Sequence, residues 1–193
     1  MKRNNPIEWF QEWYKDAVRT EPRVPDAMQL STVDASGMPR IRTVLMKGLD
    51  ARGLVFYTNY ASPKSVQLTE TPRASACFHW KDLARQVIIA GPVSRVSAEE
   101  SDAYFASRGR GSQIGAWASA QSQPIDSREA LLAQVAAVTA RFEGQQVPRP
   151  PGWGGYRIDI ERWEFWQDHA DRLHDRWILT RSGSGWSSQR VQP

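Results

Sequence analysis

Two short turn sequences between runs of strand-forming residues constrain the fold of this chain most. Asp34-Ala35-Ser36-Gly37 follows a run at 27–33, and Asp50-Ala51-Arg52-Gly53 follows a run at 40–47. A third run, at 54–58, comes directly after the second turn. Connections this short join antiparallel neighbours, because parallel strands need a long crossover. The sequence therefore predicts an antiparallel sheet rather than a parallel α/β fold.

The rest of the chain adds strands and a set of helices around them. Asn5-Pro6 is typical of a helix start, and apolar residues then recur at helical spacing. We expect helices at about 6–20, 62–70, 97–107 and 126–142, strands at 74–80, 86–96, 156–160, 176–180 and 186–191, and an irregular loop at 145–155. This pattern predicts an antiparallel β-barrel with helices packed around it, a mainly β fold of the α+β class.

Composition limits the organisation and the partners of the protein. A chain of 193 residues with 40% apolar and 24% charged residues can bury one core, so we expect a single domain at 1–193. The net charge of +4 comes from scattered basic residues, which argues against a nucleic-acid partner. We also expect no metal site, because His79, His169 and His174 lack metal-ligand spacing.

Cellular location is indicated by the cysteine content and by the apolar runs. Cys77 is the only cysteine, which excludes an internal disulfide and fits a reducing cytoplasm. Its apolar neighbours favour a buried, inert thiol over a nucleophile. The sequence has no signal-peptide pattern and no run long enough to span a membrane. We therefore expect a cytoplasmic protein with no membrane partner.

The segment Arg172-Leu173-His174-Asp175-Arg176 is the strongest candidate for chemistry. If it is extended, Arg172, His174 and Arg176 project to the same side. Two fixed cations would then flank an imidazole, an arrangement that attracts an anion. A solvated, charged strand end is the alternative.

Two further regions of the first half carry groups that suit phosphate. Arg42 and Lys47 differ by an odd number, so on a regular strand they face opposite sides and contact different ligands or different parts of one. Both could instead simply extend into solvent at strand ends. Tyr57-Thr58-Asn59 leads into Ser62-Pro63-Lys64-Ser65 at a helix N-terminus, which favours phosphate, with ordinary capping as the alternative.

A third region, Arg108-Gly109-Arg110-Gly111-Ser112, combines a free backbone with two arginines and a serine. This composition suits a phosphate monoester, although a flexible surface loop has similar residues. A P-loop or G-x-G-x-x-G pattern is lacking, which disfavours a Rossmann-type nucleotide site. The three regions together predict two anion sites near one aromatic-lined cleft, as an enzyme with a phosphorylated cofactor and a phosphorylated substrate would need.

Several blocks of the sequence resemble the pyridoxine (pyridoxamine) 5′-phosphate oxidase family, in order from about residue 6 to residue 193. The blocks most specific to that family are Arg108–Trp117 and Phe165–Arg176; the others are Arg42–Lys47, Tyr57-Thr58, Arg85-Gln86-Val87, Tyr104-Phe105-Ala106-Ser107, Gln121-Ser122 and Trp153-Gly154-Gly155. The resemblance implies an FMN-binding split barrel that forms a homodimer with two FMN sites at the subunit interface. Residues 1–20 would form the N-terminal helix, and residues 150–193 the strands of the dimer contact and active site.

The resemblance also implies roles for individual residues. Arg42 and Lys64 would hold the FMN phosphate, and the rest of the flavin site would be lined by Val44, Leu45, Lys47, Tyr57, Thr58, Gln86, Gln121, Ser122, Trp166 and Arg176. The substrate phosphate would be held by Lys47, Tyr104, Arg108 and Ser112. Arg172 and His174 would be the catalytic pair over the pyridine ring, where they orient the substrate and assist proton movement.

The implied reaction is oxidation of pyridoxine or pyridoxamine 5′-phosphate at C4′ to pyridoxal 5′-phosphate, with oxygen reoxidising FMN to give hydrogen peroxide.

Two departures from the family are visible. Pro63 stands where the family typically has an arginine on the FMN phosphate, so we expect weaker flavin binding. The family's longer N-terminal arm has no counterpart before the first helix, so we expect a substrate lid to be absent.

Two other functions compete with this interpretation. One is a related flavin oxidase of the phenazine-biosynthesis type, against which the Arg108–Trp117 block argues. The other is a non-catalytic protein that binds FMN or pyridoxal phosphate, which only the missing arm supports.

Overall fold

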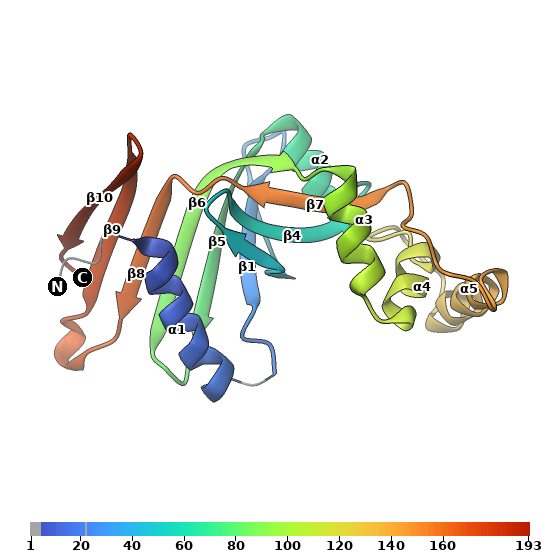
Figure 1. Cartoon of the computed structure of the whole chain (residues 1–193), viewed down its shortest axis with the longest axis horizontal. Helices are drawn as coiled ribbons and strands as arrows, with labels where there is room; N and C mark the ends of the chain where they lie inside the picture. Colours follow the sequence, from blue (N-terminus) through green and yellow to red (C-terminus); the bar gives the residue numbers. More distant parts are fainter. Residues whose placement is uncertain (1–4, 22) are drawn as a thin grey trace.

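The fold is an antiparallel sheet that curls into a half-barrel. The structure is a computed structural model and describes residues 5–21 and 23–193, so residues 1–4 of the expected N-terminal segment lie outside the described residues. Its strands are β1 (Ala27–Val33), β2 (Pro39–Leu45), β3 (Gly48–Asp50), β4 (Gly53–Asn59), β5 (Arg73–Trp80), β6 (Arg85–Arg95), β7 (Trp153–Ile158), β8 (Arg162–Gln167), β9 (Asp175–Ser182) and β10 (Gly185–Val191). Its helices are α1 (Pro6–Thr20), α2 (Pro63–Glu70), α3 (Ala98–Ser107), α4 (Arg110–Ala118) and α5 (Arg128–Arg141) (Figure 1).

Strand β6 divides the sheet into two parts. Among the described strands the main order is β10-β9-β8-β6-β5-β1-β2, and β7 joins the far end of β6 to β4 and β3. Residues 85–90 of β6 pair with β8, whereas residues 93–95 pair with β7. Gly91 lies at the change of partner, where a Cβ atom would come within 1.9 Å of the Asp159 carbonyl oxygen. A glycine is therefore needed where the two parts of the sheet separate.

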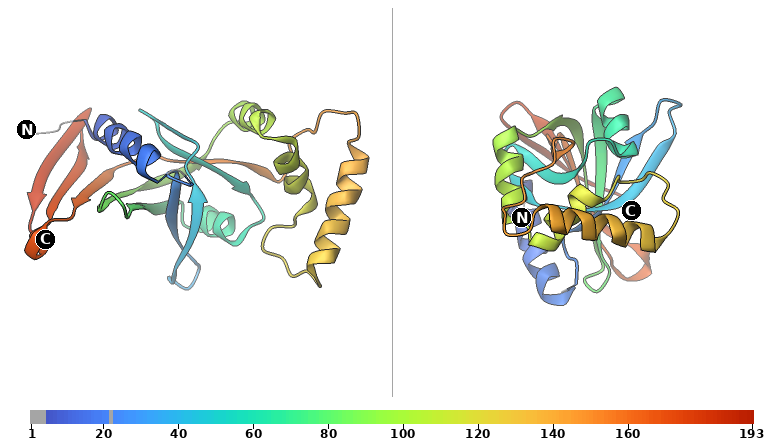
Figure 2. Two further views of the ribbon diagram at one scale, coloured as in Figure 1. Left: turned by 90° about the horizontal axis from the view of Figure 1, so that it is seen from below. Right: turned by 90° about the vertical axis from the view of Figure 1, so that its right-hand side faces the viewer.

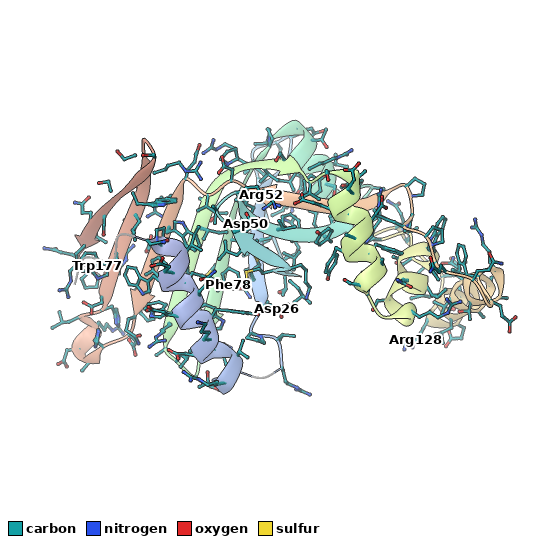
Figure 3. The ribbon with its side chains drawn as sticks, in the orientation of Figure 1. Asp26, Asp50, Arg52, Phe78, Arg128 and Trp177 are labelled. Atoms are coloured by element: carbon teal, nitrogen blue, oxygen red, sulfur yellow. The ribbon has the colours of Figure 1, made fainter. Side chains whose placement is uncertain are left out.

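Helix α1 covers one face of the sheet and closes the main core. Asn5 caps it by accepting from the backbone N–H groups of Ile7 and Glu8, and Pro6 occupies the first turn. Its buried face includes Trp9, which stacks on Phe165 of β8 with ring centroids 4.0 Å apart. Phe10 contacts Phe78 of β5, which lies beneath the helix (Figure 3). Burial of these rings supplies most of the driving force for docking the helix.

A second, smaller core lies under the helices at the other end of the molecule. It consists of Phe105, Ile114, Phe142, Val147 and Trp153. Helix α5 contacts α4 but buries none of its own residues. Figure 2 shows α5 at one end of an elongated molecule and β9 and β10 at the other.

Most of the expected elements are confirmed within one to three residues. The predicted strand at 27–33 is observed with the same bounds, and the predicted helices at 62–70 and 97–107 correspond to α2 and α3. The sequence analysis missed β3, β8 and α4. Helix α4 contains Gly111 and Gly115, which disfavour helix, and it is held by packing of Ile114 in the second core.

The expected strand geometry at residues 172–176 is wrong. Residues 170–172 form a single 3₁₀ turn, Asp171 and Arg172 have φ of 58° and 60°, and β9 begins only at Asp175. Side chains alternate only along an extended backbone, so Arg172, His174 and Arg176 do not share one face of a strand.

None of the helices in the described part of the chain has the length and apolar character to cross a membrane.

Candidate functional site

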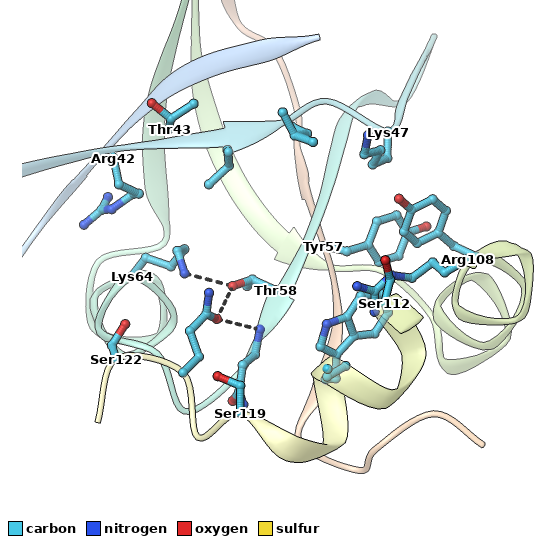
Figure 4. Close-up of a pocket in the computed structure, with 18 of the residues that line it drawn as sticks. Arg42, Thr43, Lys47, Tyr57, Thr58, Lys64, Arg108, Ser112, Ser119 and Ser122 are labelled. Atoms are coloured by element: carbon cyan, nitrogen blue, oxygen red, sulfur yellow. Dashed lines mark hydrogen bonds between the residues drawn. The ribbon is translucent and has the colours of Figure 1, made fainter. Parts of the chain in front are cut away.

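One large pocket opens where β2, β4 and α2 meet α3 and α4 (Figure 4). Its volume is about 970 Å³. The described residues that line it are Arg42, Thr43, Val44, Leu45, Lys47, Tyr57, Thr58, Asn59, Pro63, Lys64, Tyr104, Arg108, Gly109, Ser112, Gly115, Ala116, Ser119, Gln121, Ser122 and Trp153. Twelve of the residues that the sequence analysis assigned to cofactor or substrate are therefore brought together in one cavity.

Arg42 lies at one end of this pocket and is held by neutral acceptors. Its Nη1 donates to the Thr32 hydroxyl at 2.6 Å and to the Leu30 carbonyl at 3.2 Å. Its Nη2 donates to Gln67 Oε1 at 3.0 Å. The side chain thus has a fixed direction but no carboxylate partner among the described residues.

Lys64 lies beside Arg42 and is also held by neutral groups. Its ammonium donates to Thr58 Oγ1 at 2.9 Å (Figure 4). It also donates to Ser62 Oγ at 3.1 Å. Burial, together with the nearby charge of Arg42, lowers the pKa of Lys64 to about 8. Ser62 is the N-cap residue of α2, yet its side chain makes no capping bond to the helix backbone. Ordinary capping therefore does not explain this Ser-Pro-Lys sequence.

The segment after α4 completes this end of the pocket. Gln121 Oε1 accepts from Thr58 Oγ1 at 3.1 Å and from the backbone N–H of Asn59 at 3.2 Å. Ser122 adopts φ of 68°, a left-handed conformation that is uncommon outside glycine. Strands β1, β2 and β4 and helix α2 therefore all contribute residues around the Arg42 and Lys64 cations, together with the segment after α4.

Arg108 lies at the other end of the pocket, between aromatic rings. Its guanidinium carbon is 4.8 Å from the Trp153 ring centroid and 5.5 Å from that of Phe105. Tyr104 stacks on Tyr57 with centroids 4.0 Å apart and forms the adjacent wall. Burial lowers the pKa of Arg108. Its Nη1 is buried without a hydrogen-bond partner, which is costly unless a ligand accepts from it.

The remaining predicted residues at this end are Ser112 and Lys47. Ser112 projects from the first turn of α4, so the alternative of a flexible surface loop is wrong for residues 110–112, which begin a helix. Lys47 forms an ion pair with Asp26 at 2.7 Å. Arg42 and Lys47 line the same pocket because β2 ends at Leu45, before the alternation reaches Lys47.

The other predicted site residues lie apart from this pocket, towards the β8–β10 side of the molecule. Gln86, Trp166 and Arg176 are direct neighbours across β6, β8 and β9. Directly opposed residues share one face of an antiparallel sheet, so these three side chains form a row. The row lies on the face away from α1, because Phe165, the neighbour of Trp166, packs on the helix.

His174 lies against this row and not in the large pocket. Its ring centroid is 4.7 Å from that of Trp166. Its Nδ1 is 2.9 Å from Asp168 Oδ1 and accepts from the His169 backbone N–H at 3.2 Å. His174 lines a cavity of about 370 Å³ together with residues 190–193, and Arg172 lines neither cavity.

Arg176 is paired within the chain. Its guanidinium donates to Glu164 Oε1 at 2.7 Å, and Glu164 also binds Arg162. Burial raises the pKa of Glu164, but hydrogen bonds from both arginines outweigh it, so the net pKa is lowered. The predicted contact of Arg176 with a flavin therefore stays a prediction.

Sequence reasoning missed two polar residues of the site, Thr32 and Gln67. Both are buried, with Thr32 at 1% and Gln67 at 9% exposure, and both bind Arg42. Thr32 continues the inward-facing positions of β1, where a polar residue is unusual. That departure from the apolar pattern is the only signal in the sequence that could have indicated it.

The geometry defines a protein that binds small phosphorylated molecules. The pocket holds cations at both ends, and Arg42, Lys64 and Arg108 have no carboxylate partner within the described residues. Its walls between these cations are aromatic and apolar, which suits a ring system. Within the described part of the chain, His, Cys, Asp and Glu side chains do not gather in groups of three that could hold a metal ion.

The chain belongs to the pyridoxamine 5′-phosphate oxidase family. The family model described as "Pyridoxamine 5′-phosphate oxidase" matches residues 14–167. The model described as "Pyridoxine 5′-phosphate oxidase C-terminal dimerisation region" matches residues 153–193. Together the two matches cover nearly all of the sequence.

Individual relatives give the same result. The chain is 52% identical over 189 residues to a pyridoxine/pyridoxamine 5′-phosphate oxidase of Rubrobacter xylanophilus, covering 98% of this chain and 87% of the relative. It is 53% identical over 192 residues to that of Azorhizobium caulinodans, covering 98% of this chain and 91% of the relative.

Solved structures confirm the split-barrel fold. PhzG from Burkholderia lata 383, solved in complex with tetrahydrophenazine-1-carboxylic acid, superposes with a TM-score of 0.93 at 33% identity, covering 100% of this chain and 94% of that one. A pyridoxamine 5′-phosphate oxidase-related, FMN-binding protein from Nostoc punctiforme superposes with a TM-score of 0.76 at 19% identity, covering 95% of this chain and 97% of that one, and supports the fold alone.

Proposed function

We propose that this protein is an FMN-dependent oxidase that converts pyridoxine or pyridoxamine 5′-phosphate into pyridoxal 5′-phosphate. Oxygen is the electron acceptor and hydrogen peroxide the product. The single observation that carries this proposal is one pocket with uncompensated cations at both ends, Arg42 and Lys64 at one and Arg108 at the other. A phosphorylated cofactor and a phosphorylated substrate would occupy such a pocket together.

The residues present fit FMN at the Arg42 end. Arg42 and Lys64 would bind its phosphate, and Gln121 and Ser122 would border the same subsite. Val44, Leu45, Tyr57 and Thr58 line the pocket between the two ends and would contact the rest of the cofactor. Bound FMN would supply the redox chemistry by accepting a hydride equivalent from C4′ of the substrate.

The Arg108 end fits the substrate phosphate. The buried, unpartnered Nη1 of Arg108 would donate to a phosphate oxygen, and Ser112 and Tyr104 would donate from the two neighbouring helices. Lys47 would approach the same phosphate after giving up part of its contact with Asp26. These contacts orient the pyridine ring, and orientation is the main task of the protein when a cofactor performs the chemistry.

A homodimer would unite the two separated groups of site residues. The C-terminal region that matches the dimerisation model contains Trp166, Arg172, His174 and Arg176. Apolar side chains beside the pocket are also exposed, with Ile41 at 70%, Leu45 at 38% and Val66 at 48%. Such residues are typical of an interface. In this arrangement, His174 and Arg172 of one subunit complete the pocket of the partner.

Within that completed site, Arg172 and His174 act on the substrate ring. Asp168 and the His169 backbone N–H both engage His174 Nδ1, so Nε2 is the ring nitrogen directed to the substrate. His174 Nε2 would exchange a proton with the C4′ substituent, and Arg172 would hold the ring in position. A covalent intermediate with the protein is not required. For the amine substrate, the imine formed at C4′ is hydrolysed and ammonia is released.

Steady-state peroxide assays test the proposal directly. We expect the purified protein to be yellow from flavin, and to form peroxide with pyridoxine or pyridoxamine 5′-phosphate. Turnover of neither substrate would refute the proposed reaction. Turnover of tetrahydrophenazine-1-carboxylic acid instead would indicate a phenazine-type oxidase.

An anaerobic experiment separates an enzyme from a binding protein. Flavin absorbance should bleach when either vitamer phosphate is added without oxygen. A protein that binds FMN and substrate but never bleaches would be a non-catalytic carrier.

The expected cytoplasmic location stays a prediction, which cell fractionation would test.

A further inference from the structure

The acceptors around Arg42 differ from those around Arg157 and Arg176, two other partly buried arginines of the described residues. Arg157 pairs with Asp50 and Glu100, and Arg176 pairs with Glu164. Pairing with carboxylates is the usual way to hold a guanidinium away from water. Arg42 instead donates to the Gln67 amide oxygen, the Thr32 hydroxyl and a backbone carbonyl.

These acceptors form one rigid frame from two elements. Thr32 Oγ1 accepts from Arg42 and donates to Gln67 Oε1 at 2.5 Å, so the same amide oxygen accepts from both residues. Thr32 is part of β1 and Gln67 is part of α2, and both are almost fully buried. The frame therefore fixes the guanidinium plane on two sides while contributing no negative charge.

The same helix also presents the second cation. Lys64 lies three residues before Gln67 on α2, one helical turn away. Its partners, Thr58 and Ser62, are hydroxyl groups. Two adjacent cations held only by neutral groups repel each other, and this repulsion is relieved when a dianion binds between them.

We propose that Gln67 and Thr32 are positioning residues that aim the Arg42 guanidinium into the pocket and leave its whole charge for the phosphate of the cofactor. This inference rests on the proposed function, which assigns the FMN phosphate to Arg42 and Lys64. A carboxylate at position 67 could accept the same two hydrogen bonds, but it would cancel the charge that the phosphate needs. Glutamine and glutamate have side chains of the same shape, so the amide at position 67 differs from a carboxylate mainly in adding no negative charge.

Binding of FMN and of riboflavin to the flavin-free protein tests this, because riboflavin lacks only the phosphate. We expect Gln67→Glu to raise the FMN dissociation constant about 10- to 100-fold, the loss of one charge-assisted contact, and to leave riboflavin affinity unchanged. Quenching of flavin fluorescence reports both constants. Unchanged riboflavin affinity also shows that the pocket is intact, which a purely structural role of Gln67 would not predict.

Three further variants sharpen the result. Thr69→Glu adds the same charge on the exposed face of α2 and should leave the FMN-to-riboflavin ratio unchanged. Gln67→Met and Thr32→Val remove one acceptor each without adding charge, and each should weaken FMN binding less than Gln67→Glu does. The two neutral variants also keep the proposal testable if Gln67→Glu does not fold.

Several outcomes would overturn the inference. It is wrong if Gln67→Glu, or both neutral variants, bind FMN as wild type does, or if Thr69→Glu weakens FMN binding as much as Gln67→Glu. A wild-type protein that binds riboflavin as tightly as FMN would instead show that the proposed phosphate site is wrong. The two failures are thus distinguishable.

Discussion

Lys64 carries a charge that depends on pH in the range where the protein would work. It is 7% exposed, and burial beside Arg42 lowers its pKa to about 8. Below that pH the ligand-free protein presents an ammonium, and above it the amine is neutral. The phosphate of FMN is a dianion throughout, because its second pKa is about 6. Binding above pH 8 therefore requires uptake of a proton by Lys64.

We accordingly predict that FMN binding weakens as pH rises. The dissociation constant should be flat from about pH 7 to 8 and then rise by up to about tenfold per pH unit. Fluorescence quenching measured across this range checks the profile. Lys64→Arg is the matched control, since a guanidinium stays protonated and should abolish the break near pH 8. Identical profiles for the two proteins would contradict the assignment.

Pro63 gives a second prediction at the level of one residue. It is exposed at the first position of α2, lines the pocket beside Lys64, and is the position at which the family resemblance leads us to expect an arginine. Pro63→Arg should tighten FMN binding by about 1.5–3 kcal/mol, the value of one charge-assisted hydrogen bond. Pro63→Gln removes the proline without adding charge and serves as the control. An arginine variant that binds no tighter than the glutamine variant would show that position 63 does not reach the phosphate.

Sequence reasoning identified the charged residues of the pocket more readily than the residues that hold them. Lys64 and Arg108 lie beside hydroxyl, helix-start or glycine patterns that suit phosphate, whereas Arg42 was noted as a cation on a strand and given its phosphate role by the family resemblance; all three line the pocket. Thr32 and Gln67 gave no comparable signal, because contacts across 35 residues of sequence are set by packing of β1 against α2. Tertiary structure decides which neutral group meets a given cation.

At the scale of elements, docking of α1 on the sheet supports the barrel that carries the pocket. Phe10 is 1% exposed and contacts Phe78, Trp80 and Trp163. Phe10→Ala should lower the free energy of unfolding by about 3–5 kcal/mol, through lost burial and the cavity left behind. Urea unfolding of the flavin-free protein measures this. Val18→Ala, on the exposed side of the same helix, should change stability by less than about 0.5 kcal/mol. Equal effects of the two changes would mean that α1 does not dock as described.

The elements that could be predicted are those whose local signals agree with their environment. The hairpin around residues 34–37 was predictable because turn residues separate two strand-forming runs. The turn at 50–53 was also predicted, but the strand that it joins to β4 is β3, not the predicted run at 40–47. Strand β8 was missed because Glu164, at a central position, is buried by two arginines rather than by apolar packing. Helix α4 was missed because its glycines oppose helix formation and only the second core stabilises it.

At the scale of the whole molecule, one chain leaves the predicted site divided. Arg42, Lys64 and Arg108 line the large pocket, whereas Arg172 and His174 lie towards the β8–β10 side. No periodicity in a sequence states which residues of two identical chains face each other. The expectation that two subunits share one site could therefore come only from the family resemblance. The separation of the two groups of residues within one chain is the arrangement that a shared site requires.

Subunit complementation tests whether the site is shared. Arg108→Ala damages the pocket and His174→Ala damages the group near β9, so each variant alone should lose most turnover while His174→Ala keeps its FMN. If a site combines the pocket of one subunit with His174 of the other, a mixed dimer contains one intact site and one doubly damaged site. Unfolding and refolding an equimolar mixture should then recover about one quarter of wild-type turnover, since half of randomly formed dimers are mixed. Refolded single variants are the controls. No recovery from a mixture in which mixed dimers are demonstrated would place His174 and Arg108 of the same chain in one site, and loss of flavin from His174→Ala would contradict its assignment to the substrate.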